Sequence, residues 1–333
     1  MILRTVDWHT GGEPTRIVVD GWPLLTGRTL LDKRRECQER HDSLRRGLML
    51  EPRGHAGMYG ALLVEADHPD ADLAVLFLHN EGYSTMCGHA VIALARWAVQ
   101  SGRVKVVEPE TTVRLQCPCG LVTARVSVSG GRAGAVRFES VPAFVLARDR
   151  LAPTRRFGPV AVDVAYGGAF YAILAAETVG LDLRRSAMRD VVDAGEEIAR
   201  TAAGAIDVRH PDEPDLGFLY GTILTDGGDG LDRPSLNVCI FAGRQVDRSP
   251  TGSGVTARMA LAWRRDAARA AREHRFESCT GAVFSGRVLA AAASVGPHAA
   301  CTVEVGGTAH PMAEAAFRFD ADDPLASGFA LRD

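Results

Sequence analysis

The sequence predicts an α+β fold with two domains, each built around one buried helix. The chain has 333 residues, which is too long for one average domain and ordinary for two. Short β-branched segments recur between glycines in both halves. Each half also contains a turn of small residues that leads into an apolar segment: STMCGHAVIALARWAV at residues 84–99 and DRSPTGSGVTARMALAW at residues 247–263.

Strands dominate the expected secondary structure. In the first half, apolar alternation between turn residues predicts strands over residues 15–21, 60–67, 71–80, 120–131 and 135–146. The second half repeats this style at residues 158–174, 216–224, 235–242 and 301–307. Because strands and helices do not alternate strictly, a doubly wound sheet is not expected.

Helices are fewer, and we predict them over residues 88–100, about 183–201, and 254 to about 275. The basic, alanine-rich segment 264–275 is then the exposed end of the last helix, with cations that complement the helix dipole. No G-x-G-x-x-G follows an early strand, so no nucleotide cofactor is expected.

Composition excludes several classes of partner. The formal net charge is −3, from 38 basic and 41 acidic residues, so no large field of one sign would attract nucleic acid. Asp7 and His9 interrupt the apolar N-terminus, and no apolar run reaches the roughly 18 residues of a membrane span, so we expect a cytoplasmic protein with no membrane contact.

The cysteines indicate reduced thiols. Seven cysteines, an odd number with scattered spacing, do not form a disulfide framework. Cys117-Pro-Cys119 lacks both the spacing and the second cysteine pair of a structural zinc site. We therefore interpret it as the end of a strand, and expect no metal.

The two helix starts are the candidate functional elements. Cys87 precedes the first apolar helix and Thr251 precedes the second, each followed by glycine. A helix N-terminus presents unpaired backbone N–H groups that bind anions, and glycine allows a ligand to approach closely. Two such starts facing one cleft would bind a carboxylate.

A cysteine at a helix start points to proton abstraction. The field of the helix lowers the pKa of such a thiol, so we expect Cys87 to ionise near neutral pH. A thiolate beside a bound carboxylate can remove the α-proton, and the N–H donors stabilise the charge that develops. This chemistry needs neither metal nor cofactor. The purely structural alternatives are a buried thiol for Cys87 and an N-cap hydroxyl for Thr251.

The sequence resembles the proline racemase family over essentially its whole length. The matching stretches are DWHTGGEPTRIV at 7–18, EPRGHAGMYGALL at 51–63, MCGHAVIALARW at 86–97, VDVAYGGAFYA at 162–172 and NVCIFAGRQVDRSPTGSGV at 237–255. The resemblance implies two pseudo-symmetric domains of the diaminopimelate-epimerase type, each a curved mixed sheet around a central helix. We place residues 1–150 and about 318–333 in the first domain, with Cys87, and 151–317 in the second, with Thr251.

One position departs from the racemase pattern. In racemases and epimerases of this family both helices start with cysteine, one thiol removing the α-proton and the other protonating the opposite face. Here Thr251 stands at the second start, and its hydroxyl is too weak an acid and base for this exchange. The Cys/Thr pair resembles the family branch that dehydrates trans-3-hydroxy-L-proline. There the 3-hydroxyl leaves as water and the enamine tautomerises to Δ1-pyrroline-2-carboxylate.

The resemblance also implies roles for individual residues. Cys87 is the proton acceptor, with Gly88 and His89 contacting the substrate at the first helix start. His89 is also a candidate donor of a proton to the departing hydroxyl. Asp247 is expected to pair with the ring ammonium, its alternative being a turn-forming residue.

At the second helix start, Gly252 and Ser253 contact the substrate. Thr251 either hydrogen-bonds the substrate carboxylate or caps the helix.

Other residues in family-like stretches have less defined roles. For His9, Glu13 and His55 a role in shaping loops is at least as good an interpretation as catalysis. Tyr166 and Phe170 would line the pocket or fill the core.

Two competing functions stay open. A proline racemase or 4-hydroxyproline 2-epimerase could use another group in place of the second cysteine, and a non-catalytic protein could simply bind imino acids. Thiol alkylation separates these classes, because it would abolish turnover in an enzyme and need not abolish binding. The resemblance also implies a homodimer.

Overall fold

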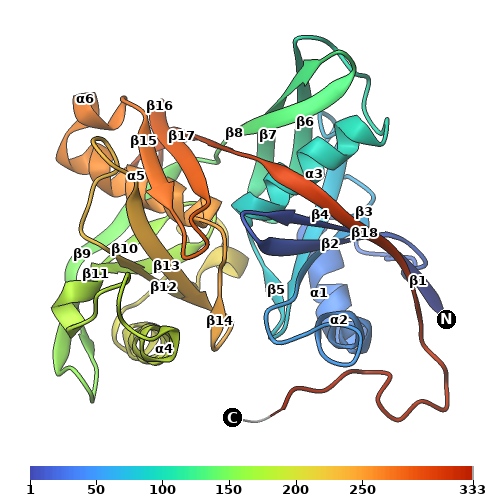
Figure 1. Ribbon diagram of the computed structural model, residues 1–333, viewed down its shortest axis with the longest axis horizontal. Coiled ribbons are helices and arrows are strands. Elements are labelled where there is room, and N and C mark those ends of the chain that lie inside the picture. Colours follow the sequence, from blue (N-terminus) through green and yellow to red (C-terminus); the bar gives the residue numbers. More distant parts are fainter. Residues whose placement is uncertain (332–333) are drawn as a thin grey trace. The chain divides into compact units, whose positions relative to one another are not determined.

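A computed structural model describes residues 1–331 as two compact units (Figure 1). The first comprises Met1–Val136 and the segment from Thr308 onward, and the second comprises Arg137–Gly307. The sequence instead predicts domain boundaries at residues 150 and 317. The difference follows from strand pairing, because β9 (Ala143–Pro153) pairs within the second unit and β18 (Ala309–Arg318) returns to pair with β1 (Ile2–Thr10).

The first unit is built on a mixed sheet. β1 lies antiparallel to both β18 and β2 (Glu13–Asp20), and β2 runs parallel to β3 (Tyr59–Val64). β4 (Leu73–His79) lies antiparallel to β3 and to the short β5 (Tyr83–Ser84), and parallel to β6 (Glu110–Cys117). β7 (Gly120–Ser129) follows β6 in a hairpin, and β8 (Arg132–Glu139) leads toward the second unit. Cys117 thus ends a strand, as the sequence indicated.

Helix α3 (Gly88–Gln100) is the central helix of this unit and has the predicted bounds. Its residues are buried on nearly every face, and it packs against β1, β2, β6, β7 and β18 (Figure 1). The helix is therefore apolar all round because the unit's own sheet surrounds it.

Two further helices of the first unit were missed. α1 (Leu30–Arg40) and α2 (Asp42–Met49) pack on β4. α1 is strongly charged, and its buried positions include Lys33 and Arg34, whose head groups donate to the carbonyls of Glu65 and Tyr83. Such a helix lacks an apolar stripe, although the capping box of Thr29 and Asp32 marks its start.

The sheet of the second unit closes on itself. From β9 it passes through β10 (Pro159–Tyr166), β11 (Phe170–Ala175), β12 (Leu219–Thr225) and β13 (Ser235–Phe241). It continues through β15 (His274–Glu277), β16 (Val283–Val295) and β17 (His298–Gly307), which pairs back onto β9. β14 (Gln245–Val246) is a short addition to β13.

Helix α5 (Gly252–Arg265) packs against five of these strands, β9, β10, β11, β16 and β17, while α4 (Met188–Ala205) packs against β9, β11, β12 and β13. The prediction that the last helix continues to about residue 275 is wrong. α5 ends at Arg265 because the Asp266 side chain accepts from the Arg269 N–H at 3.0 Å and caps the short α6 (Ala267–Ala270). From His274 the basic segment is already a strand.

Candidate active site

Cys87 is the N-cap residue of α3, and its sulfur faces the first turn of the helix. The Ala90 N–H points at Cys87 Sγ across 3.4 Å, and the residue is 5% exposed. A backbone N–H donor aimed at the sulfur favours negative charge there, whereas burial of the sulfur opposes it. The ionisation of Cys87 stays a prediction.

His89 lies beside that sulfur. Its Nδ1 is 3.1 Å from Cys87 Sγ, and its Nε2 is 3.2 Å from the carbonyl oxygen of Pro14. The Thr10 hydroxyl donates to the His89 carbonyl at 2.9 Å, so the hairpin between β1 and β2 holds both ends of this residue. The motif around Cys87 predicts His89 but not this support, because residues far apart in the chain provide it.

Thr251 is the corresponding N-cap residue of α5, but its conformation differs. Its φ of 63° is a left-handed conformation that is rare for a β-branched residue, whereas φ at Cys87 is −146°. The Thr251 side chain makes no capping hydrogen bond, which removes the helix-capping alternative. Its Oγ1 is buried and has no hydrogen-bond partner within residues 1–331.

The first turn of α5 is packed tightly by the VAYGGAFYA segment. A Cβ added at Gly167 would overlap the carbonyl oxygen of Ser253 and crowd Ala257, so only glycine fits between the strand turn and the helix. The Tyr171 hydroxyl is 2.7 Å from Ser253 Oγ. The Ser253 hydroxyl is therefore engaged within the unit, and the free contribution of this turn is its backbone N–H groups.

Asp247 forms the turn that precedes Thr251. Its Oδ1 accepts from the Ser249 N–H at 2.7 Å, and its own N–H donates to the Cys239 carbonyl at 3.0 Å. Ser249 Oγ in turn accepts from the Thr251 N–H at 3.1 Å. Asp247 thus has the turn role considered from the sequence, and its contact with substrate stays a prediction.

The less defined candidates have structural surroundings. His9 Nδ1 accepts from Gly12 at 3.3 Å, and burial, with the neighbouring His310 second, lowers the pKa of His9. His55 Nδ1 accepts from Gly57 at 3.1 Å, and Glu13 is fully buried.

Tyr166 and Phe170 are buried in an aromatic cluster with Phe144. The ring centroids of Tyr166 and Phe170 are 4.8 Å apart. This packing places them in the core of the second unit.

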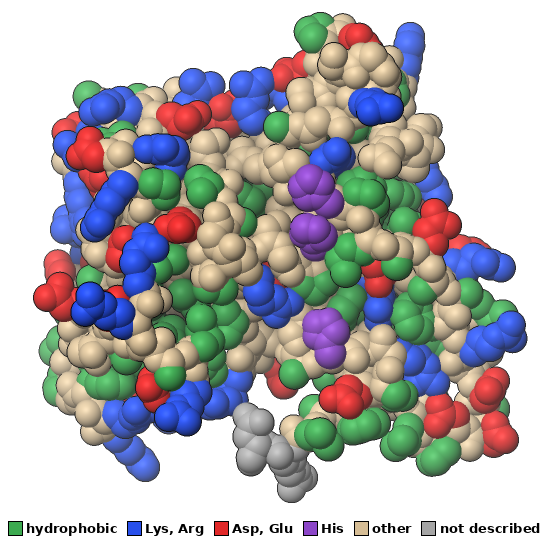
Figure 2. All heavy atoms as spheres, viewed as in Figure 1, with side chains coloured by type: hydrophobic (Ala, Val, Ile, Leu, Met, Phe, Trp, Pro, Cys, Tyr) green, Lys and Arg blue, Asp and Glu red, His purple; other side chains and the backbone are tan. Residues whose placement is uncertain are grey.

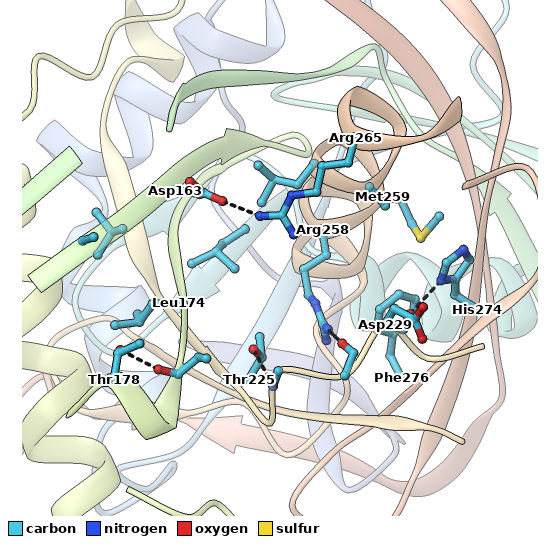
Figure 3. Close-up of a pocket in the computed structure, with 18 of the residues that line it drawn as sticks. Asp163, Leu174, Thr178, Thr225, Asp229, Arg258, Met259, Arg265, His274 and Phe276 are labelled. Atoms are coloured by element: carbon cyan, nitrogen blue, oxygen red, sulfur yellow. Dashed lines mark hydrogen bonds and ion pairs between the residues drawn. The ribbon is translucent and has the colours of Figure 1, made fainter. Parts of the chain in front are cut away.

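A cavity of about 410 Å³ in the second unit is a different place (Figure 3). It lies between β10, β11 and the C-terminal half of α5, and no predicted site residue lines it. Its two arginines have protein partners: Arg265 pairs with Asp163 at 3.0 Å, and Arg258 donates to Asn237 and Ser235 at 2.9 and 2.8 Å. We therefore do not assign the reaction to this cavity.

Two further properties bear on partners. Within residues 1–331 no group of three or more His, Cys, Asp or Glu side chains is arranged to bind a metal ion, and no helix has the length and apolarity to cross a membrane. On the face seen in Figure 2, basic and acidic side chains are interspersed. That distribution agrees with the small net charge of the sequence.

Comparison with known proteins places the chain in a family. The family model "Proline racemase" matches residues 5–330. The chain belongs to the proline racemase family. A trans-L-3-hydroxyproline dehydratase of Xenopus tropicalis is 51% identical over 334 residues, 99% of this chain and 96% of that protein. A 3-hydroxyproline 2-epimerase of Burkholderia multivorans is 44% identical over 99% of this chain and 98% of its own length.

A solved structure supports the same assignment. The crystal structure of a probable proline racemase from Agrobacterium radiobacter K84, with bound carbonate, superposes with a TM-score of 0.93 at 29% identity. The match covers 99% of this chain and 96% of that one. The family resemblance and the α+β fold predicted from the sequence are thus confirmed.

Proposed function

We propose that this member of the proline racemase family is a trans-3-hydroxy-L-proline dehydratase, a hydro-lyase. The observation that carries the proposal is the 51% identity, over 99% of the chain, to a protein named trans-L-3-hydroxyproline dehydratase. The two helix starts supply the chemical reason. The N-cap residue of α3 carries a thiol and the N-cap residue of α5 carries a hydroxyl, so the chain has one strong acid–base group at these positions instead of two.

Cys87 is the base of the proposed reaction. Its sulfur is buried at the start of α3 and faces the Ala90 N–H. As a thiolate it removes the proton from Cα of the substrate. Negative charge then spreads onto the substrate carboxylate, and backbone N–H groups of a helix N-terminus stabilise charge of that kind.

The loss of water completes the reaction. The electrons of the broken Cα–H bond form a double bond between Cα and C3, and the C3–O bond breaks with its electron pair leaving on oxygen. After protonation that oxygen departs as water, and the enamine tautomerises to Δ1-pyrroline-2-carboxylate. The elimination is redox-neutral and requires no cofactor. No proton has to return to Cα, so one base is sufficient.

Thr251 contributes a hydrogen bond in this proposal. Its buried Oγ1 lacks a protein partner among the described residues, and an unsatisfied buried hydroxyl costs on the order of 1–3 kcal/mol. The carboxylate of a bound imino acid accepts hydrogen bonds and would relieve this cost. We therefore propose that the Thr251 hydroxyl donates to the substrate.

The remaining contacts follow from the state of each side chain. Because Tyr171 engages the Ser253 hydroxyl, the first turn of α5 contributes the N–H groups of Gly252 and Ser253. Gly88 plays the same part at the start of α3. Asp247 retains one carboxylate oxygen beyond its turn bond, which we assign to the substrate ammonium. Homodimer formation and a cytoplasmic location stay predictions.

Epimerisation is the second candidate function. It is favoured by the 44% identity to a protein named 3-hydroxyproline 2-epimerase. Thr251 weighs against it, because epimerisation needs a second group that returns a proton to Cα. Non-catalytic binding of imino acids would not require a thiol beside a histidine.

The decisive assay incubates the purified protein in parallel with trans-3-hydroxy-L-proline, trans-4-hydroxy-L-proline and L-proline. Proton NMR detects Δ1-pyrroline-2-carboxylate, and chiral chromatography detects inversion at Cα. We expect the pyrroline from the 3-hydroxy substrate alone. Inversion of any substrate at a rate comparable with dehydration would favour the epimerase, and binding without any product would favour the binding protein.

A further inference from the structure

The stereochemistry of the proposed substrate restricts where the leaving-group acid can lie. In trans-3-hydroxy-L-proline the hydroxyl and the carboxylate are on opposite faces of the ring. The α-hydrogen is also opposite the carboxylate, so the hydroxyl and the α-hydrogen share one face. Hydroxide is a poor leaving group and needs a proton as the C3–O bond breaks. The proton donor must therefore act from the same face as Cys87.

His89 is the group that the structure places there. Its Nδ1 is 3.1 Å from Cys87 Sγ, within reach for direct proton transfer. Its Nε2 is 3.2 Å from the Pro14 carbonyl oxygen, which can only accept a hydrogen bond, so Nε2 carries a hydrogen. The atom that can gain and lose a proton is consequently Nδ1, on the side of the sulfur.

The ring is also held in this orientation. The Tyr59 ring meets it edge to face, with centroids 4.8 Å apart, and the Tyr59 hydroxyl is 2.5 Å from Ser84 Oγ. His89 is 3% exposed. A buried ring held on two sides cannot easily turn away, and its Nδ1 lies nearer the Cys87 sulfur, at 3.1 Å, than its Nε2, at 3.6 Å.

Cys117 is a further ionisable group near Cys87, and it is unsuited to donating the proton. Burial, followed by the charges of Cys119 and Cys87, raises the pKa of the Cys117 thiol well above its ordinary value. Such a thiol is a poor proton donor.

We infer that His89 is the catalytic acid of the dehydration, and this inference rests on the proposed function. Before reaction, Cys87 is a thiolate and His89 an imidazolium. The thiolate takes the α-proton as the C3–O bond breaks, and Nδ1–H protonates the departing oxygen to give water. The Cys87 thiol then passes its new proton to the neutral Nδ1, which restores the starting pair. The α-proton thus leaves the substrate and a proton leaves in water, with no net change in the enzyme.

The test uses a leaving group that needs no proton. In trans-3-fluoro-L-proline, fluorine takes the place of the hydroxyl on the same face, departs as fluoride and leaves the same enamine. His89→Gln keeps an N–H donor for the Pro14 carbonyl but cannot transfer a proton. We expect kcat/KM to fall about 100-fold or more with the hydroxy substrate and less than about 10-fold with the fluoro substrate, measured by pyrroline formation and fluoride release.

A matched control is His68→Gln, which changes a histidine of the β3–β4 loop whose Nδ1 accepts from the Asp70 N–H; it should change both rates by less than about threefold. Equal losses with the two substrates in His89→Gln would overturn the inference, because His89 would then only position or activate the thiol. Failure of the wild type to dehydrate trans-3-hydroxy-L-proline would instead overturn the proposed function.

A second measurement needs no variant. In cis-3-hydroxy-L-proline the hydroxyl lies on the face opposite the α-hydrogen, beyond the reach of His89. The wild type should dehydrate it at least about 100-fold more slowly than the trans isomer. Comparable rates would show that the acid is not on the face of Cys87 and would also contradict the inference.

Discussion

At the scale of single residues, Thr251 combines two unfavourable features, a left-handed backbone and a buried hydroxyl without a partner. Each costs free energy of folding, and strained residues of this kind concentrate at functional sites. The same hydroxyl is the proposed donor to the substrate. Stability and substrate binding therefore place opposite demands on this side chain.

Thr251→Val tests that conflict. Valine has nearly the same shape and removes the unsatisfied hydroxyl, so the free energy of unfolding of the substrate-free protein should rise by about 1 kcal/mol in urea titrations. KM for trans-3-hydroxy-L-proline should rise about 10-fold or more, because a hydrogen bond to a charged group is lost.

Thr222→Val is the matched control. Thr222 Oγ1 is also buried without a partner in the described part of the chain. The residue lies in β12, and by strand alternation its side chain points to the face opposite that of Ile223, which packs against Gly254 in the first turn of α5. This variant should gain similar stability with unchanged KM. If KM rises equally in both variants, Thr251 has no specific contact with the substrate.

Asp247→Asn separates charge from turn formation. Asparagine can still accept the hydrogen bond from the Ser249 N–H, so the turn and the fold should persist. Loss of the counter-charge for the ring ammonium should lower kcat/KM by about 10–100-fold. Steady-state kinetics that match the wild type would assign Asp247 to the turn alone.

At the scale of elements, sequence pattern predicts the helices that the sheets surround and misses those that polar contacts hold. α3 is apolar on every side, and its bounds were predicted to the residue. α1 was not predicted because Lys33 and Arg34 are buried and donate hydrogen bonds to carbonyls distant in sequence, which a local sequence pattern does not indicate. The end of α5 was not predicted because the alanine-rich sequence continues beyond Asp266. There the Asp266 side chain caps the start of a new helix.

The same limit applies to the candidate site. Cys87, His89 and Thr251 were found because motif and helix periodicity are local signals. The Pro14 carbonyl that orients His89, and the Gly167 turn that packs on α5, come from strands remote in sequence. These contacts cannot be predicted from the sequence because they depend on how the strands are arranged in the fold.

Gly167→Ala probes the support of α5. The added Cβ would overlap the Ser253 carbonyl, so the first turn of the helix must shift. We expect a loss of about 1–3 kcal/mol in the free energy of unfolding and a marked fall in kcat. Gly204→Ala in α4 is the control, since its Cβ would meet no atom within 4 Å and alanine favours a helix. If both variants behave alike, Gly167 is not needed for close packing.

At the scale of the whole molecule, the two units repeat one plan with different chemistry at the helix starts. Both central helices begin with glycine directly after the N-cap, at Gly88 and Gly252. The cap is a thiol in one unit and a hydroxyl in the other. We interpret this difference as the reason that the protein eliminates water instead of inverting Cα.

Thr251→Cys tests this interpretation. A thiol at the start of α5 would meet the field of a helix N-terminus, which favours ionisation. The variant should gain measurable racemisation of L-proline, or epimerisation of trans-4-hydroxy-L-proline, while the wild type shows neither. Chiral chromatography after incubation in D₂O is the readout. Formation of D-proline by the wild type at a rate comparable with the variant would show that another group already serves as second acid.

The central claim, that Cys87 is the base of a dehydratase, is tested most directly by Cys87→Ser. Serine is nearly isosteric and is not ionised near neutral pH, so circular dichroism and thermal unfolding should match the wild type. The rate of Δ1-pyrroline-2-carboxylate formation from trans-3-hydroxy-L-proline, followed by NMR, should fall about 10²–10⁴-fold, the usual cost of losing a general base. A folded Cys87→Ser protein that keeps a tenth or more of the wild-type rate would contradict the claim.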